Sequence, residues 1–168
     1  MVSAPAMWNS TMELRVQLRE ITPPIWRHIA VPADCTLDVL HEILQIAFGW
    51  TSSHLHAFKV GTVRFGVADV ENELLVVDES HAPLGALCRK GDSFVYEYDF
   101  GDGWKHDVRV EAVYEKGIDV RVECLDGARA APPEDCGGTP GYENVVSALT
   151  NPEHPERREI RTWGRTCV

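Results

Sequence analysis

Two histidines separated by one residue, His54 and His56, stand out as side chains whose type and spacing could bind a metal. Residues two apart in a strand point to the same side, so both imidazoles could face one ion. A metal site usually needs three or four protein ligands. Asp99, Asp102 and His106 could supply the remainder if their strands lie beside the first. These residues are therefore candidate metal-binding or ligand-binding positions.

The same residues also fit purely structural roles. His106 shares one face of its segment with Val108 and Val110, a pattern typical of a core histidine. Asp99 and Asp102 flank a glycine, and an aspartate beside glycine stabilises a tight turn by bonding its own backbone. Both interpretations stay open on the sequence alone.

A second group of reactive side chains lies in the segment PPEDCGG, Pro132–Gly138. Glu134 and Asp135 could serve as acid and base groups or as ligands, and Cys136 could be a nucleophile near a histidine. Alternatively, the carboxylates cap backbone amides and the glycines permit positive φ in a connection between strand and helix. We favour this second interpretation, with Glu134, Asp135, Cys136 and His106 kept as catalytic candidates.

Aromatic residues form the third group, which consists of Trp26, Trp50, Tyr96, Tyr98 and Trp104. Aromatic faces can stack on bases or other ligands. The alternation of the segments that carry them favours packing in the core for most of the group. Trp104 is kept as a candidate binding residue.

The charge balance limits the partners. The chain of 168 residues has 16 Lys and Arg against 26 Asp and Glu, a net charge of −10, which works against sequence-independent contact with a phosphate backbone. The one dense basic stretch, from Arg157 to Arg165, is interrupted by carboxylates. We expect no non-specific binding to nucleic acid, random duplex DNA included, and a protein or small molecule as the partner.

Other features point to a cytoplasmic protein without a membrane partner. No apolar run approaches the ~20 residues that span a bilayer, and the N-terminus does not resemble a secretory signal. The five cysteines are odd in number, widely spaced and without a CxxC pair, so we expect free thiols. They are Cys35, Cys88, Cys124, Cys136 and Cys167.

The first half of the chain predicts two strands followed by a helix. Residues 12–20 alternate apolar and polar side chains, residues 25–31 resume an extended pattern after a Pro-Pro pair, and residues 36–48 have apolar side chains at helical spacing. Thr36 is the expected N-cap and Gly49 the expected terminator. Strands are expected at 55–60 and 62–67, and one helical turn at 83–88.

The second half predicts a long hairpin. Residues 94–100 and 104–114 alternate on either side of a Gly-Asp-Gly turn, and residues 118–124 are expected to form a third consecutive strand. An irregular segment at 126–141 and a short helix at 142–149 follow. The expected fold is α+β: a mixed, largely antiparallel sheet with a β-grasp-like strand-strand-helix opening and a long second hairpin. The expected core contains Leu37, Leu40, Ile43, Leu44, Phe94, Tyr96, Val108, Val110 and Val122.

Three blocks of the chain carry a family resemblance: Pro23–Phe58 (PPIWRHIAVPADCTLDVLHEILQIAFGWTSSHLHAF), Phe94–Glu111 (FVYEYDFGDGWKHDVRVE) and Ala131–Glu143 (APPEDCGGTPGYE). Together they resemble the plasmid pRiA4b ORF-3-like family. The resemblance implies one domain at 11–155, between a disordered leader at 1–10 and a short tail at 156–168. Many members have a cysteine where this chain has Ala131, so a two-cysteine metal clamp with Cys136 is excluded here.

The resemblance implies an association with plasmids or mobile elements, since members are sometimes labelled TnpR or transposon passenger proteins. A serine recombinase needs a catalytic serine and a basic DNA-binding helix, and the sequence indicates neither. We therefore expect an uncharacterised binding or interaction module, without a firmly expected cofactor. The alternative is a metal-dependent or Cys/His/carboxylate hydrolase built on His54, His56, Asp99, Asp102, His106 and the PPEDCGG segment.

Overall fold

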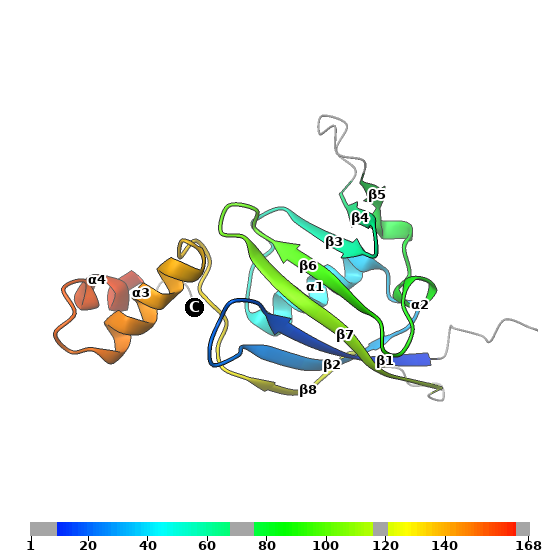
Figure 1. The fold of residues 1–168 in the computed structure, drawn as a ribbon, viewed down its shortest axis with the longest axis horizontal. Helices are drawn as coiled ribbons and strands as arrows, with labels where there is room; N and C mark the ends of the chain where they lie inside the picture. The colour runs from blue at the N-terminus through cyan, green and yellow to red at the C-terminus, as the bar shows by residue number, and fades with distance from the viewer. Residues whose placement is uncertain (1–9, 68–75, 116–120, 164–168) are drawn as a thin grey trace, which may run out of the picture.

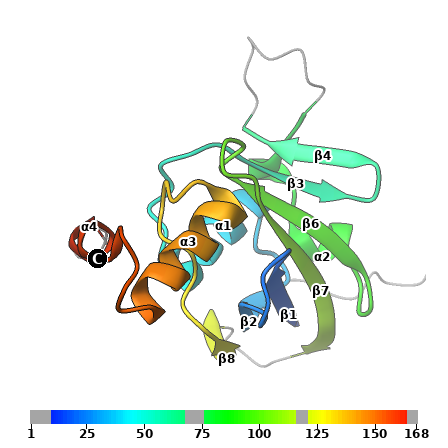
Figure 2. The same cartoon turned by 60° about the vertical axis from the view of Figure 1, so that its left-hand side comes forward.

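The protein is built around one open sheet. The computed structural model describes residues 10–67, 76–115 and 121–163. Eight strands lie in the order β5-β4-β3-β6-β7-β1-β2-β8, and neighbouring strands are antiparallel except for β4 and β5. Helix α1 packs on one face of this sheet (Figures 1 and 2). The α+β class with a mixed, largely antiparallel sheet is therefore confirmed.

The strand-strand-helix opening is present as the sequence predicts. β1 (Ser10–Leu18) pairs with β2 (Trp26–Pro32), and α1 (Leu37–Phe48) follows. The helix buries its apolar stripe completely against the sheet, because Leu37, Leu40 and Leu44 recur on one side of it. Gly49 ends α1 in the left-handed conformation, at φ 76°. The expected side-chain cap from Thr36 does not form.

The middle of the chain adds the upper sheet edge and the long hairpin. β3 (His56–Val60), β4 (Val63–Gly66) and β5 (Val77–Asp78) precede a 3-10 helix, η2 (Glu79–His81), and α2 (Leu84–Leu87). The hairpin consists of β6 (Ser93–Tyr98) and β7 (Trp104–Glu115). Alternate side chains of the hairpin enter the core.

The expectation of a third consecutive strand beside the hairpin is wrong. β8 (Glu123–Ala128) pairs with β2 at the far edge of the sheet and not with β7. Almost all of its residues are exposed, and the preceding Val122 is 52% exposed rather than in the core. An edge strand with little packed on either face does not bury its apolar positions, so alternation there is misleading. Residues 118–120 of the expected strand lie outside the described residues.

The C-terminal helices also differ from expectation. α3 (Gly138–Thr150) begins four residues before the expected start, because a proline in the first turn has no amide that needs an intrahelical acceptor. α4 (Arg157–Trp163) lies in the expected tail. Arg157 Nη1 donates to the carbonyls of Ala148 and Leu149, at 3.1 and 2.8 Å, and so caps the end of α3.

The core follows the predicted positions with two exceptions. Ile43 is only half-buried and Val122 is exposed, whereas the other seven are buried. The four cysteines in the described ranges have free thiols, and Cys167 lies outside them. Within the described residues, no helix has the length and apolar character needed to cross a membrane. Residues 1–9 of the expected leader lie outside the described residues, and Ser10 belongs to β1.

Candidate functional site

The loop after α1 is fixed by hydrogen bonds from its backbone to side chains. The Ser52 amide donates to Gln45 Oε1 at 2.8 Å, and the Ser53 amide donates to the Tyr98 hydroxyl at 3.1 Å. Burial, and then the neighbouring Glu134, raise the pKa of Tyr98 well above its usual value, so the phenol stays protonated. The loop therefore holds the next residue, His54, in a defined place.

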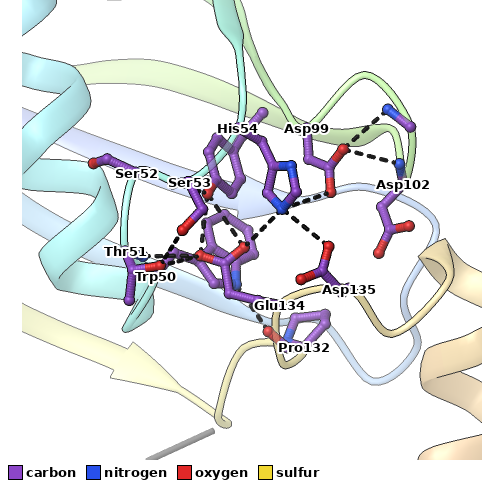
Figure 3. A network of polar contacts seen from close by, with 12 residues as sticks. Trp50, Thr51, Ser52, Ser53, His54, Asp99, Asp102, Pro132, Glu134 and Asp135 are labelled. Carbon is purple, nitrogen blue, oxygen red and sulfur yellow. Dashed lines mark hydrogen bonds and ion pairs between the residues drawn. The ribbon is translucent and has the colours of Figure 1, made fainter.

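Asp99 approaches His54 from the end of β6. Its backbone is left-handed, at φ 54°, and its carboxylate is buried. Oδ1 accepts from the amides of Gly101 and Asp102, at 3.0 and 3.3 Å, which forms the turn that an Asp-x-Gly sequence favours. The other carboxylate oxygen of Asp99, Oδ2, faces the His54 imidazole (Figure 3).

The PPEDCGG segment is docked onto this loop. The Trp50 indole donates to the Pro132 carbonyl at 2.8 Å, and Glu134 Oε1 accepts from the Thr51 amide at 2.8 Å. The Tyr98 hydroxyl donates to the same carboxylate at 3.1 Å. On the other side, the Gly137 amide donates to Asp102 Oδ2 at 3.0 Å. The favoured interpretation, in which Glu134 and Asp135 cap backbone amides, thus describes Glu134, whereas Asp135 lies against His54 and the second amide-bound carboxylate is that of Asp102.

Three carboxylates surround a single imidazole nitrogen as a result (Figure 3). His54 Nε2 lies 3.0 Å from Asp135 Oδ1, 3.7 Å from Asp99 Oδ2 and 3.8 Å from Glu134 Oε2. The nitrogen is buried, yet none of the three oxygens meets it with hydrogen-bond geometry. Asp135, by contrast, keeps 72% of its side chain exposed and places the site at the surface.

The charges and spacing of this cluster suit a cation. A protonated imidazole supplies one positive charge against three carboxylates, and the carboxylates repel one another. Ligand atoms of His54, Asp99 and Asp135 lie within 4.8 Å of one another. Donors on one divalent ion are each about 2.0–2.2 Å from it, so they can be at most ~4.4 Å apart. If the distances between these ligand atoms shortened by a few tenths of an ångström, the three side chains could bind one ion together.

The comparisons with known proteins agree with the fold. A sequence model of the plasmid pRiA4b ORF-3-like protein family matches residues 10–166. The chain belongs to this family.

Two relatives of this pRiA4b ORF-3-like protein support the assignment without naming a function. An uncharacterised protein, y4hQ, from Sinorhizobium fredii is 36% identical over 159 residues, which cover 94% of this chain and 82% of the relative. The crystal structure of a protein of unknown function, MM3350, from Methanosarcina mazei Go1 matches with a TM-score of 0.83 and 33% identity. That match covers 92% of this chain and 89% of the other.

In the pRiA4b ORF-3-like fold, His56 faces a different group of side chains from His54. His56 Nε2 contacts Glu79 at 2.9 Å, and its ring stacks on His41 with centroids 3.5 Å apart. The hypothesis that both imidazoles share one ligand assumed that both lie in a strand. Because β3 begins only at His56, His54 belongs to the preceding loop and follows a different course.

The remaining candidates lie beneath or beside the site. His106 is fully buried against Phe48 and Trp50, and burial lowers its pKa to about 4. Trp104 is also buried. Burial, followed by Asp102, raises the pKa of the Cys136 thiol to about 12, so it is not a thiolate at neutral pH.

Three of the supporting residues, Gln45, His41 and Glu79, were not singled out by the sequence, and Tyr98 was named only in the aromatic group that was mostly expected to pack in the core. The Tyr98 hydroxyl and the Gln45 amide hold the loop, while His41 and Glu79 form the buried partners of His56. His41 and Gln45 were detectable in principle, because they are polar residues at buried positions of the α1 stripe. Glu79 carries no such signal, since its segment is otherwise polar.

Proposed function

We propose that this protein is a non-enzymatic binding module whose ligand-binding centre is a divalent-cation site formed by His54, Asp99 and Asp135, with Glu134 beside it. One observation carries the proposal: a buried imidazole nitrogen without hydrogen-bond geometry faces three carboxylate oxygens within 4 Å. Such a cluster gains most from a positive charge at its centre.

The donor set favours a transition metal over calcium or magnesium. Imidazole nitrogen suits zinc, iron or nickel, whereas sites for calcium and magnesium are formed by oxygen atoms. Mixed nitrogen and carboxylate ligands are compatible with Zn²⁺ and Mn²⁺, and these two ions are the probes of choice. The other positions around the ion would hold water or a partner's donor atom.

The surroundings support binding more than catalysis. Cys136, the cysteine of the PPEDCGG segment, is held as a thiol. Glu134, the carboxylate beside the three proposed ligands, already accepts from the Thr51 amide and the Tyr98 hydroxyl. The family name adds an association with plasmids, and the free thiols suit a cytoplasmic location.

A metal-dependent hydrolase is the second candidate, favoured by one observation. The proposed ion has only three near protein ligands, one of them the exposed Asp135. An open coordination position beside solvent is what catalytic zinc sites use to activate water.

The test is metal binding by the purified full chain. After treatment with chelator, calorimetric titration with Zn²⁺ and Mn²⁺ should give about one equivalent, and metal at 100 times its Kd should add about 2.7 kcal/mol to the free energy of unfolding. His54→Ala and Asp135→Asn should abolish or sharply weaken binding. His81→Ala is the matched control, because His81 is 85% exposed and pairs with Asp78 outside the site.

Failure of the wild-type chain to bind either ion, or equal binding by His54→Ala, would contradict the cation site. Metal-loaded protein should then be assayed with chromogenic phosphodiester and ester substrates. Turnover that disappears in both site variants and persists in the control would replace the binding module with the hydrolase.

A further inference from the structure

Basic side chains that are scattered along the sequence gather on the sheet face opposite α1. In Figure 1 this face, formed by β1, β7, β6, β3 and β4, turns towards the viewer. It contains two shallow hollows of about 650 and 500 Å³. Their walls carry seven basic and three acidic side chains, a net charge of +4 in a chain of −10. The basic residues are Arg15, Arg19, Lys59, Arg64, Lys90, Lys105 and Arg109; the acidic ones are Glu97, Asp107 and Glu111. We call this surface the open face.

Two pairs of cations lie directly opposite each other across neighbouring strands. Arg15 of β1 pairs with Arg109 of β7, and Lys59 of β3 pairs with Arg64 of β4. Like charges directly opposite on one face destabilise a sheet. The first pair lines the larger hollow and the second lines the smaller one. Each hollow therefore holds two cations whose mutual repulsion an anion would relieve.

Two acidic side chains of the open face form ion pairs with its cations, and the other two lie near one imidazole, that of His28. Asp107 binds Arg19 at 2.5 Å, Glu97 lies 3.7 Å from both Arg64 and Lys105, and Glu111 lies 3.6 Å from His28. On the same face, Glu13 also lies near His28, at 3.2 Å.

Three cations remain without a counterion on this surface. Within the described ranges, no ion pair involves Lys59, Lys90 or Arg109. Arg15 lies over the Trp26 ring at 4.0 Å, which leaves its charge available. About four positive charges are thus free to meet an anionic partner.

We propose that the open face binds the phosphate backbone of single-stranded nucleic acid, at a surface separate from the His54 site. Arginine recognises phosphate with two parallel hydrogen bonds, and lysine adds a point charge. The two hollows lie on a common surface and share Ser93. A single strand that crosses the sheet can place successive phosphates in both of them, against the available cations.

The composition of the face favours phosphates over a protein partner. The core of a protein–protein interface is apolar and depleted of charge. Here the apolar residues that line the hollows (Ala57, Phe58, Phe94, Val95 and Val110) are buried or half-buried, and Arg15 covers Trp26. A phosphate backbone needs no such apolar anchor, because charge neutralisation supplies its affinity.

A single strand also fits better than a duplex. A rigid duplex touches a flat surface along one line, whereas a flexible strand can follow both hollows. The excess negative charge elsewhere on the chain opposes the binding of either form of nucleic acid. At physiological salt, however, charges more than ~8 Å away are largely screened. The expectation for random duplex DNA therefore stays a prediction of no binding.

Fluorescence anisotropy with a labelled oligodeoxythymidylate of about 20 nucleotides tests the proposal across a series of salt concentrations. With about four phosphates neutralised, the slope of log K against log salt should be about −2.8, since each contributes about −0.7 on a single strand. The double variants Arg15→Gln/Arg109→Gln and Lys59→Gln/Arg64→Gln should each bind more weakly. The first variant should flatten the slope by about 1.4.

The matched control is Arg158→Gln/Arg161→Gln on α4, which removes the same charge from a different surface. It should keep wild-type affinity and slope. The proposal is overturned if the wild-type chain does not bind the oligonucleotide at low salt, or if the control loses as much affinity as the open-face variants. Equal competition by polyglutamate of the same charge would instead identify an acidic protein as the partner. Melting temperatures at or above wild type would exclude misfolding of the variants.

Discussion

The His54 site and the open face concentrate opposite charges by different structural means. At the site, Glu134 and Asp135 reach His54 and Asp99 across a long sequence separation, because the PPEDCGG loop is bonded to the loop after α1. On the open face, strand alternation and register alone bring Arg15 beside Arg109. The site therefore depends on specific hydrogen bonds, whereas the face depends on the sheet. Substitutions should separate the two regions cleanly.

Among single substitutions, the largest effect should come from Asp99→Ala. This change removes a proposed cation ligand and leaves the amides of Gly101 and Asp102 without their acceptor, at a cost of about 1–3 kcal/mol. Asp135→Ala removes a ligand from an exposed position and should change stability by less than about 0.5 kcal/mol. Urea denaturation and metal titration measure the two quantities separately. Equal stability of the two variants would mean that the turn does not depend on the carboxylate.

A second effect concerns the buried layer on which both regions rest. Burial lowers the pKa of His106 to about 4 and, together with His56, that of His41 to about 3. Between these values and the usual pKa near 6.5, the unfolded chain binds protons that the folded chain does not, so the free energy of unfolding falls as the pH falls. Each of the two histidines should lower the free energy of unfolding by about 2 kcal/mol between pH 7 and pH 5.

Urea titrations at the two pH values measure this loss. His106→Phe should abolish about half of this loss, because one of the two buried imidazoles is removed. The phenyl ring that replaces it can still pack against Phe48 and Trp50. A wild-type chain with constant stability between pH 7 and pH 5 would show that these imidazoles are not buried in their neutral form.

A smaller effect should distinguish the two regions directly. Tyr98→Phe removes the hydroxyl that accepts from the Ser53 amide and donates to Glu134. The loss should be about 1 kcal/mol in stability, with weaker metal binding, because the loop that carries His54 is less firmly held. Oligonucleotide binding should be unchanged. Anisotropy and calorimetry on one preparation would decide this, and parallel losses in both assays would mean that the regions are coupled.

The smallest effect in stability should be a gain. Arg109→Glu replaces a like-charge pair with Arg15 by an opposite-charge pair, which should stabilise the sheet by about 0.2–1 kcal/mol. The same change should abolish oligonucleotide binding and leave metal binding intact. Thermal denaturation at low ionic strength gives the first quantity. A loss of stability would contradict the view that Arg15 and Arg109 repel each other on the open face.

The fold was largely predictable, and the main failure has a clear cause. β1, β2, α1 and the β6–β7 hairpin alternate or repeat with clear burial, so their patterns identified them. Val122 and β8 were misjudged because an exposed edge strand retains apolar residues that do not pack. The site was partly predictable: His54, Asp99, Glu134 and Asp135 were all candidates. His56 was assigned to the wrong neighbour, because the start of β3 decides where that ring points.

The chain's residue types, the alternation of its strands and its family resemblance can all be read from the amino-acid order. Which of the candidate ligands meet depends on how the strands and loops pack together. Strand periodicity assigns a side chain to a face, but the identity of its cross-strand neighbour depends on register and strand order, which arise from contacts far apart in the chain. That is why a chain of net charge −10 can display a basic face, and why His54 and Asp135, 81 positions apart, approach to 3.0 Å.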